Sequence, residues 1–161
     1  MNIAIVGATG NVGRKTLEVL ERKGLPIDDL YLVASSKSAG KKIHFQGKDI
    51  VVSELENFNF SKVKIASFAA GGKISEKFAE KAAKHCLVID NSSFFRMDPD
   101  VPLIVPQVNS NALNDIKKNI IANPNCSTAQ LVIALKPLHD MGNSVKSNLF
   151  CKIFRFNIFT I

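Results

Sequence analysis

The sequence predicts an α/β protein with a Rossmann-like, doubly wound and mostly parallel sheet. Short apolar segments rich in isoleucine and valine alternate with segments of helical periodicity along the 161 residues. The first apolar segment, residues 2–6, runs directly into closely spaced glycines and then into a helical pattern. Such a strand–turn–helix unit predicts a dinucleotide site at the carboxyl edge of the sheet.

Composition and charge narrow the class of protein. The length of 161 residues and the 46% of hydrophobic residues predict one globular domain with a hydrophobic core. The net charge of +7 comes from scattered basic residues mixed with acids, which disfavours nucleic acid as a partner and is compatible with phosphate-bearing ligands. We expect no membrane span, no signal peptide and a cytoplasmic location. The three cysteines (Cys86, Cys126 and Cys151) lack metal-ligand spacing, so we expect neither disulfides nor a metal.

The first turn carries the glycine motif Gly7, Gly10 and Gly13, followed by helical spacing through Leu17 and Leu20. Glycines permit the tight turn and let the backbone approach a pyrophosphate at a helix N-terminus. The spacing is GxxGxxG rather than GxGxxG, and a plain turn is the alternative. Its position after the first strand favours dinucleotide binding.

The second predicted strand, residues 30–34, leads into Ser36, Lys37 and Ser38. An NAD site usually has an acid at this end of the second strand, where it accepts a hydrogen bond from the ribose 2′-hydroxyl. No acid follows this strand directly, and hydroxyl groups with a lysine suit a 2′-phosphate. The segment therefore favours NADP over NAD, with a solvated polar loop as the alternative.

Further elements follow in order. A hairpin is predicted over 42–45 and 49–52, a strand over 64–68 ending in small residues, a helix over 75–84, a strand over 87–90, two proline-bounded steps over 102–109, a short helix over 111–117 and a strand over 120–122. Arg96 comes just after the fourth of these elements, at the edge where α/β sheets bind ligands, and its guanidinium suits a phosphate. A surface ion pair is the alternative. His44, His85 and His139 fit structural or solvated roles better than catalysis.

The last predicted unit places a cysteine between a strand and a helix, in the run Asn-Pro-Asn-Cys-Ser-Thr at residues 123–128. Ser127 and Thr128 stand where helix-capping residues are expected. Unpaired N–H groups at the start of a helix stabilise a thiolate, so Cys126 is a candidate nucleophile. A small buried hydrophobic residue is the alternative.

Six motifs in order and register resemble aspartate-semialdehyde dehydrogenase over residues 1 to about 140. They occupy residues 7–13, 34–41, 70–72, 90–96, 105–109 and 124–128. The resemblance implies reduction of β-aspartyl phosphate to aspartate semialdehyde with NADPH, on the route to lysine, threonine and methionine. It also implies phosphate as a second small-molecule ligand, and a homodimer.

The resemblance assigns roles to individual residues. Cys126 would attack the acyl phosphate and form a thioester that accepts hydride, while Arg96 and Asn125 would bind the substrate. The implied cofactor-binding residues are Gly7, Thr9, Gly10, Asn11, Val12, Gly13, Ser36, Lys37, Ser38, Ala70 and Gly71. Within this set, residues 9–12 would meet the pyrophosphate, and Lys37 and Ser38 the 2′-phosphate.

The sequence departs from the family in three ways. Lys37 stands where the family usually has arginine, and Gln107 where it commonly has glutamate. Family members are about twice this length, and their later half carries substrate-clamping residues, a catalytic histidine and the main dimer surface. We therefore expect a dinucleotide-binding domain over 1–140 that is inactive alone. The apolar and basic segment 141–161 does not resemble the family, and we interpret it as translation past a frameshift or premature break, with a genuine short variant as the alternative.

Other functions are distinguished by single motifs. N-acetyl-γ-glutamyl-phosphate reductase shares this architecture, but its cysteine motif resembles Asn-Pro-Gly-Cys-Tyr, whereas Asn125 and Ser127 flank the cysteine here. A short-chain reductase needs a Tyr-x-x-x-Lys pair, which the single tyrosine, Tyr31, does not make. A nucleotide-binding remnant without catalysis is the alternative from another class.

Overall fold

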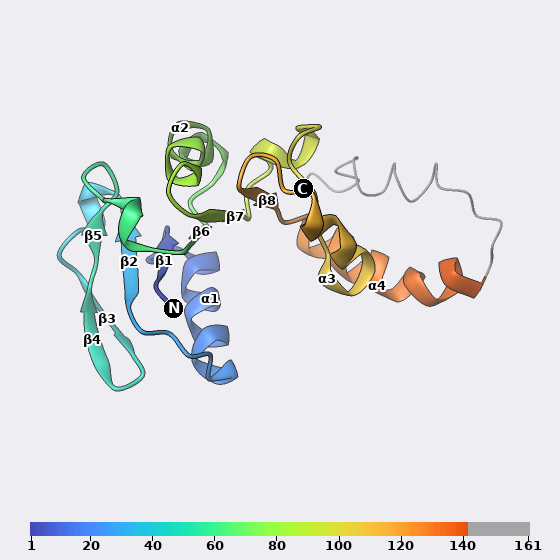
Figure 1. The fold of residues 1–161 in the computed structure, drawn as a ribbon. Helices are drawn as coiled ribbons and strands as arrows, with labels where there is room; N and C mark the ends of the chain where they lie inside the picture. The colour runs from blue at the N-terminus through green and yellow to red at the C-terminus, as the bar shows by residue number, and fades with distance from the viewer. Residues whose placement is uncertain (142–161) are drawn as a thin grey trace.

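The computed structural model describes residues 1–141, and its centre is a six-stranded parallel sheet (Figure 1). The strand order is β5-β2-β1-β6-β7-β8. The strands are β1 (Ile3–Val6), β2 (Leu30–Ala34), β5 (Ser53–Glu54), β6 (Ile65–Phe68), β7 (Leu87–Asp90) and β8 (Ile120–Ala122). The chain leaves β1 toward β2 on one side and reaches β6 on the other, so the order reverses at β1. This confirms the predicted doubly wound sheet and places its ligand-binding crevice at the carboxyl ends of these three strands.

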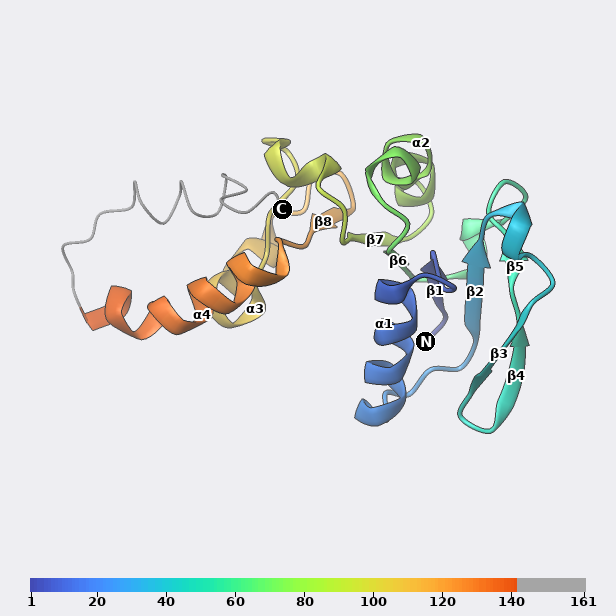
Figure 2. The same cartoon turned by 180° about the vertical axis from the view of Figure 1, so that it is seen from behind.

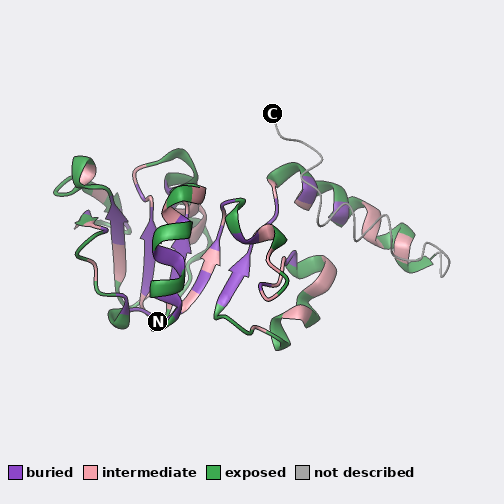
Figure 3. Cartoon of the chain, turned by 90° about the horizontal axis from the view of Figure 1, so that it is seen from above, coloured by how far each residue is buried: buried purple, intermediate pink, exposed green. Residues whose placement is uncertain are grey.

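Two helices cover opposite faces of the sheet, as Figures 1 and 2 show. Helix α1 (Asn11–Lys23) packs Leu17 into a cluster with Ile3 and Ile5 of β1. Helix α2 (Gly72–Ala83) packs Phe78 into a second cluster, which contains the other two residues of β1, Ala4 and Val6. Because both faces are covered, β1 is buried along its whole length. Figure 3 shows the buried residues concentrated in the strands and on the inner sides of these helices.

The predicted hairpin is confirmed as β3 (Lys42–Phe45) and β4 (Lys48–Val51), which pair antiparallel. Gln46 and Gly47 between them both have positive φ, 47° and 78°, as a tight two-residue turn requires. The chain then adds β5, which pairs parallel with the end of β2. Sequence analysis missed β5 because a two-residue strand has no periodicity.

Several short elements differ from their predictions. Helix α2 begins at Gly72, three residues before the predicted start, because Gly71 adopts a φ of +87° and ends the preceding loop. The second proline-bounded step is one helical turn, α3 (Pro106–Asn109), with proline at the position where no N–H is needed. The helix predicted over 111–117 is shorter and of the 3₁₀ type, η4 (Ser110–Asn114). Two further 3₁₀ turns, η1 (Ser36–Ser38) and η3 (Phe94–Met97), hold predicted site residues.

The last described element is α4 (Cys126–Met141), whose buried Val132 clusters with Val105, the residue before α3. Much of its remaining surface is apolar and exposed, including Leu138 and Met141. The predicted tail over 141–161 lies outside the described residues, except for Met141, which ends α4. Within residues 1–141 no helix is long and apolar enough to cross a membrane.

Candidate functional site

The glycine loop between β1 and α1 is packed against two neighbouring loops. Gly7 has a φ of +88°, and its N–H donates to the carbonyl of Val33 at 2.7 Å. A Cβ at Gly7 would lie 2.7 Å from the carbonyl oxygen of Ala69, and one at Gly13 would lie 2.2 Å from that of Gly7. Both positions therefore exclude any side chain, whereas a Cβ at Gly10 would meet its nearest atom at 3.4 Å. The loop needs its first and third glycines to bring α1 close to the sheet.

A cavity of about 450 Å³ lies at this carboxyl edge. Its lining includes five predicted cofactor residues: Gly7, Thr9, Gly10, Ser36 and Ala70. Its inner wall is apolar and includes the buried Leu55 and Phe78. A polar rim over an apolar wall suits a nucleotide, whose base is flat and apolar and whose phosphates are charged.

The other predicted cofactor residues surround this cavity without lining it. Asn11 and Val12 are exposed in the first turn of α1, Gly13 is buried beneath the loop, and Gly71 precedes α2. Lys37 is exposed in η1. The next residue, Ser38, accepts a hydrogen bond from Thr9 Oγ1 at 3.4 Å, which brings η1 against the glycine loop.

Two acids line the same cavity, and sequence analysis missed both. Glu54 pairs in register with Ala34, the last residue of β2, so its strand places a carboxylate beside the position where an NAD site has its acid. Glu56 follows two residues later and forms an ion pair with Lys77 at 2.6 Å. The sequence showed no acid directly after β2. The acid at this edge instead comes from β5, the strand too short to predict.

Arg96 lies in η3, beside the loop that precedes Cys126. Its Nε donates to the carbonyl oxygen of Asn123 at 3.0 Å, and its Nη2 donates to that of Asn91 at 3.2 Å. Burial lowers the pKa of the Arg96 guanidinium, while the nearby Asp90 and Cys126 act in the opposite direction. Arg96 thus places a positive charge beside the loop that leads to Cys126.

Beneath Arg96 lies a fully buried carboxylate, Asp90, at the end of β7. Ser75 Oγ donates to it at 2.7 Å, and Ser92 donates through its hydroxyl at 2.7 Å and its backbone N–H at 3.1 Å. These bonds satisfy the charge and fix the loop that leads to Arg96. Sequence analysis did not assign Asp90 a role, although an acid followed by Asn-Ser-Ser at a strand end is a signal that it could have used.

Two asparagines tie together the loops after β6, β7 and β8. Asn91 Nδ2 donates to the carbonyl of Phe68 at 3.0 Å, and Asn123 Nδ2 donates to Asn91 Oδ1 at 3.0 Å. The three loops at the carboxyl edge are thus held by side-chain hydrogen bonds to one another. This network positions the backbone that carries Cys126.

Cys126 is the first residue of α4 and is exposed. Asn125 Oδ1 accepts from the N–H of Ser127 at 2.9 Å, so Asn125 caps the helix. The prediction that Ser127 and Thr128 cap it is wrong, because both lie inside the first turn and Thr128 is buried. The thiol lies at the N-terminal end of a 16-residue helix, where the helix dipole is positive. Asn125, predicted to bind substrate, is thus also a structural residue.

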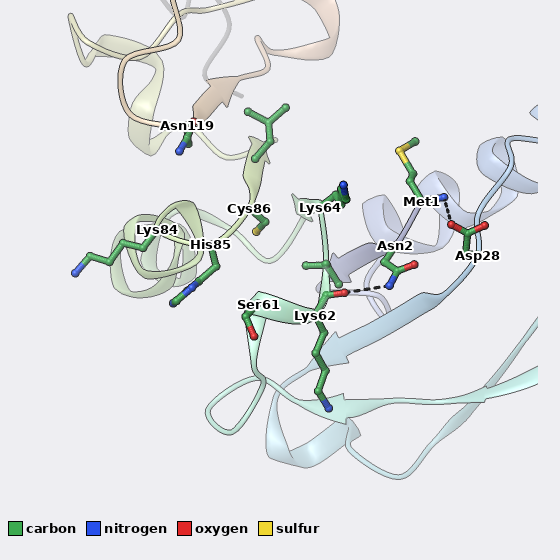
Figure 4. Close-up of a pocket in the computed structure, with 12 residues that line it drawn as sticks. Met1, Asn2, Asp28, Ser61, Lys62, Lys64, Lys84, His85, Cys86 and Asn119 are labelled. Atoms are coloured by element: carbon green, nitrogen blue, oxygen red, sulfur yellow. Dashed lines mark hydrogen bonds and ion pairs between the residues drawn. The ribbon is translucent and has the colours of Figure 1, made fainter.

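The second described cysteine lies at the opposite edge of the sheet. Cys86 is buried just before β7. It borders an open hollow of about 600 Å³ formed by residues that precede the strands, such as Met1, Lys62 and His85 (Figure 4). None of the predicted site residues lines this hollow. Within residues 1–141, no group of three His, Cys, Asp or Glu residues is arranged to hold a metal ion.

These features define a class of protein: a Rossmann-like dinucleotide domain whose binding edge also presents a cysteine at a helix start. Residues 2–116 match the family described as semialdehyde dehydrogenase, NAD binding domain, and the chain belongs to this family. Aspartate-semialdehyde dehydrogenase of Aquifex aeolicus is 55% identical over 141 residues, which are 86% of this chain and 42% of that protein. The chain thus spans about two fifths of the length of its curated relatives.

Solved structures agree with the family. The crystal structure of aspartate semialdehyde dehydrogenase II from Vibrio cholerae, complexed with ASA, is 52% identical with a TM-score of 0.85, over 86% of this chain and 46% of that chain. Aspartate semialdehyde dehydrogenase from Candida albicans, solved with NADP, is 31% identical with a TM-score of 0.70, over 87% and 47%. The similarity covers most of the residues described here.

Proposed function

We propose that this chain is the dinucleotide-binding part of an aspartate-semialdehyde dehydrogenase and carries the nucleophile of that reaction. The observation that supports this most is the position of Cys126 at the start of α4, on the same sheet edge as the glycine loop and after a loop that Arg96 contacts through the carbonyl of Asn123. The 55% identity with aspartate-semialdehyde dehydrogenase of Aquifex aeolicus also supports this proposal. We propose that residues 1–140 form this domain.

In the proposed reaction, the Cys126 thiolate attacks the acyl carbon of β-aspartyl phosphate. A carbon–sulfur bond forms, the bond from carbon to the phosphate oxygen breaks, and phosphate leaves with the electron pair. When bound at the glycine loop, NADPH would supply the hydride needed to reduce the resulting thioester. The carbon–sulfur bond then breaks, which releases the aldehyde and restores the thiolate.

The chain's own residues fit these steps. Arg96 has a planar fork of donors that suits a departing phosphate, and its hydrogen bond to the carbonyl of Asn123 holds it beside the Cys126 loop. The N-terminus of α4 stabilises the thiolate before attack. The glycine loop and the residues of η1 would hold the dinucleotide, with Lys37 and Ser38 nearest its 2′-phosphate, so NADPH would bind more tightly than NADH.

The relatives' greater length bears on the activity of the chain itself. Positioning of the substrate and proton transfer each contribute orders of magnitude to enzymatic rates. We propose that residues outside this chain supply much of both, together with the dimer contacts, and that the enzyme works in the cytoplasm. A nucleotide-binding remnant without catalysis would keep the cavity but leave Cys126 unused.

The test is a single-turnover acylation of the purified chain by β-aspartyl phosphate, followed by intact-mass and peptide analysis. We expect a thioester on Cys126 that forms far more slowly than an enzymatic turnover, and no acyl group at position 126 in the Cys126→Ser variant. No acylation of a correctly folded chain, or equal acylation of the serine variant, would contradict the assignment and favour the non-catalytic remnant.

A further inference from the structure

The cofactor cavity contains an acidic residue, Glu54, that has no role in the proposed binding of the 2′-phosphate. Glu54 is half-buried at the end of β5, level with Ala34 at the end of β2, and it lines the cavity beside Ser35 and Ser36. The serines and Lys37 favour a 2′-phosphate, whereas a carboxylate at the same edge repels one. The site therefore contains recognition elements of both signs.

The carboxylate of Glu54 is held in place and keeps acceptor capacity. Asn57 Nδ2 donates to Glu54 Oε2 at 2.9 Å, and no described cation pairs with Glu54. The charge of Glu56, in contrast, is offset by Lys77 at 2.6 Å. Glu54 is thus the cavity acid whose charge no described ion pair offsets.

A carboxylate in this place has a defined effect on a dinucleotide. It accepts a hydrogen bond from the 2′-hydroxyl of an unphosphorylated ribose, which is the role of the acid after the second strand in NAD sites. The same carboxylate and a 2′-phosphate are both negative, and their repulsion weakens binding. Neighbouring strands lie about 4.8 Å apart, so a glutamate on β5 can reach the ribose that lies over the end of β2.

We propose that Glu54 is a cofactor-specificity residue, which binds the ribose 2′-hydroxyl of NADH and limits the preference for NADPH. The chain accordingly binds both cofactors, with NADPH favoured by the η1 residues and NADH supported by Glu54. This inference rests on the proposed dinucleotide site. It adds a residue that weakens the preference of this site for NADPH over NADH.

The experiment measures dissociation constants of NADH and NADPH for the full chain by titration, in the wild type and in Glu54→Gln. Glutamine keeps an oxygen for Asn57 Nδ2 and removes the charge, so the fold should survive, and circular dichroism checks this. We expect weaker NADH binding and tighter NADPH binding. The ratio of the NADH dissociation constant to the NADPH dissociation constant should rise roughly tenfold. Glu54→Lys should raise the ratio further.

A matched control removes a charge elsewhere. Glu80→Gln alters an exposed acid of α2 that does not line the cavity, and the ratio should stay within about twofold of the wild-type value. An unchanged or lowered ratio in both Glu54 variants would overturn the role of Glu54 while leaving the dinucleotide site in place. A wild-type chain that binds neither cofactor would overturn the site itself, and with it this role.

Discussion

The two described cysteines differ in exposure and in their place in the fold. Cys126 is exposed at the start of α4, whereas Cys86 is 6% exposed and its Sγ donates to the carbonyl of Ala82 at 3.3 Å. Burial raises the pKa of the Cys86 thiol to about 11, because an apolar environment disfavours the thiolate. Reactivity in this chain should therefore follow position in the fold.

We predict that iodoacetamide at neutral pH labels Cys126 well before Cys86. The chain should carry Cys151→Ser, so that a third thiol does not compete, and peptide mapping over time gives the two rates. Cys126→Ser should leave only slow labelling that depends on unfolding. Faster labelling of Cys86 in the folded chain would contradict the assignment.

The raised pKa of Cys86 also predicts a pH dependence of stability. The folded-state pKa of about 11 exceeds the ordinary thiol pKa of 9.0, so the unfolded chain loses this proton first as the pH rises. The contribution of the buried thiol is fully present below about pH 9 and is lost as the pH approaches 11. Urea unfolding across this range should show a steeper loss of stability in the wild type than in Cys86→Ala, and equal slopes would refute the prediction.

At the scale of elements, apolar segments bounded by turn residues could be predicted even when short, whereas β5, which has no local pattern, could not. Strands β7 and β8 match their predicted bounds because turn residues flank short apolar runs. A helix at the cysteine motif was predicted correctly. Its cap, however, is Asn125 and not Ser127 or Thr128, because several residues near the cysteine have side chains able to cap a helix. Glu54 of β5 was missed because its strand is set by pairing with β2 and leaves no local pattern.

The glycine loop provides the sharpest prediction at this scale. Gly13→Ala would place a Cβ 2.2 Å from the carbonyl oxygen of Gly7, so α1 must shift away from the sheet. We expect loss of dinucleotide binding and a destabilisation of about 1–3 kcal/mol, typical of overpacking. Gly10→Ala, whose Cβ would have a 3.4 Å contact, is the control and should be milder in both measurements. Chemical denaturation and cofactor titration compare the two, and equal effects would contradict the packing argument.

At the scale of the whole molecule, the sheet brings residues distant in sequence to one edge. The glycine loop, η1, Arg96 and Cys126 could all be placed at that edge from the sequence, because parallel strands share the direction of their carboxyl ends. The residues that line the cavity could not be predicted individually. Lys37 and Gly71, which were predicted to bind the cofactor, lie beside the cavity, whereas Glu54, which was not, lines it. Side-chain direction depends on turns such as η1 that tertiary packing determines.

The sheet depends on aromatic packing at its centre. Phe68 of β6 is fully buried and stacks on Phe60 with ring centroids 6.0 Å apart. Phe68→Ala should lower the free energy of unfolding by about 3–5 kcal/mol through the transfer and cavity costs. Phe94→Ala removes a ring that is 44% exposed and should cost clearly less. Urea denaturation measures both, and a small loss for Phe68 would show that the core is not centred there.

The activity of the isolated chain follows from its share of the family's length. We predict negligible phosphate-dependent oxidation of aspartate semialdehyde, followed by the absorbance of NADPH, although the chain carries Cys126. Robust turnover by the purified chain would show that the residues described here suffice for catalysis.

The central claim is that the carboxyl edge of this sheet binds a phosphorylated dinucleotide, and calorimetric titration of the folded chain with NADPH tests it most directly. We predict saturable binding at one site, tighter for NADPH than for NADH, that Gly13→Ala abolishes. Absence of saturable NADPH binding to a chain shown to be folded would contradict the account.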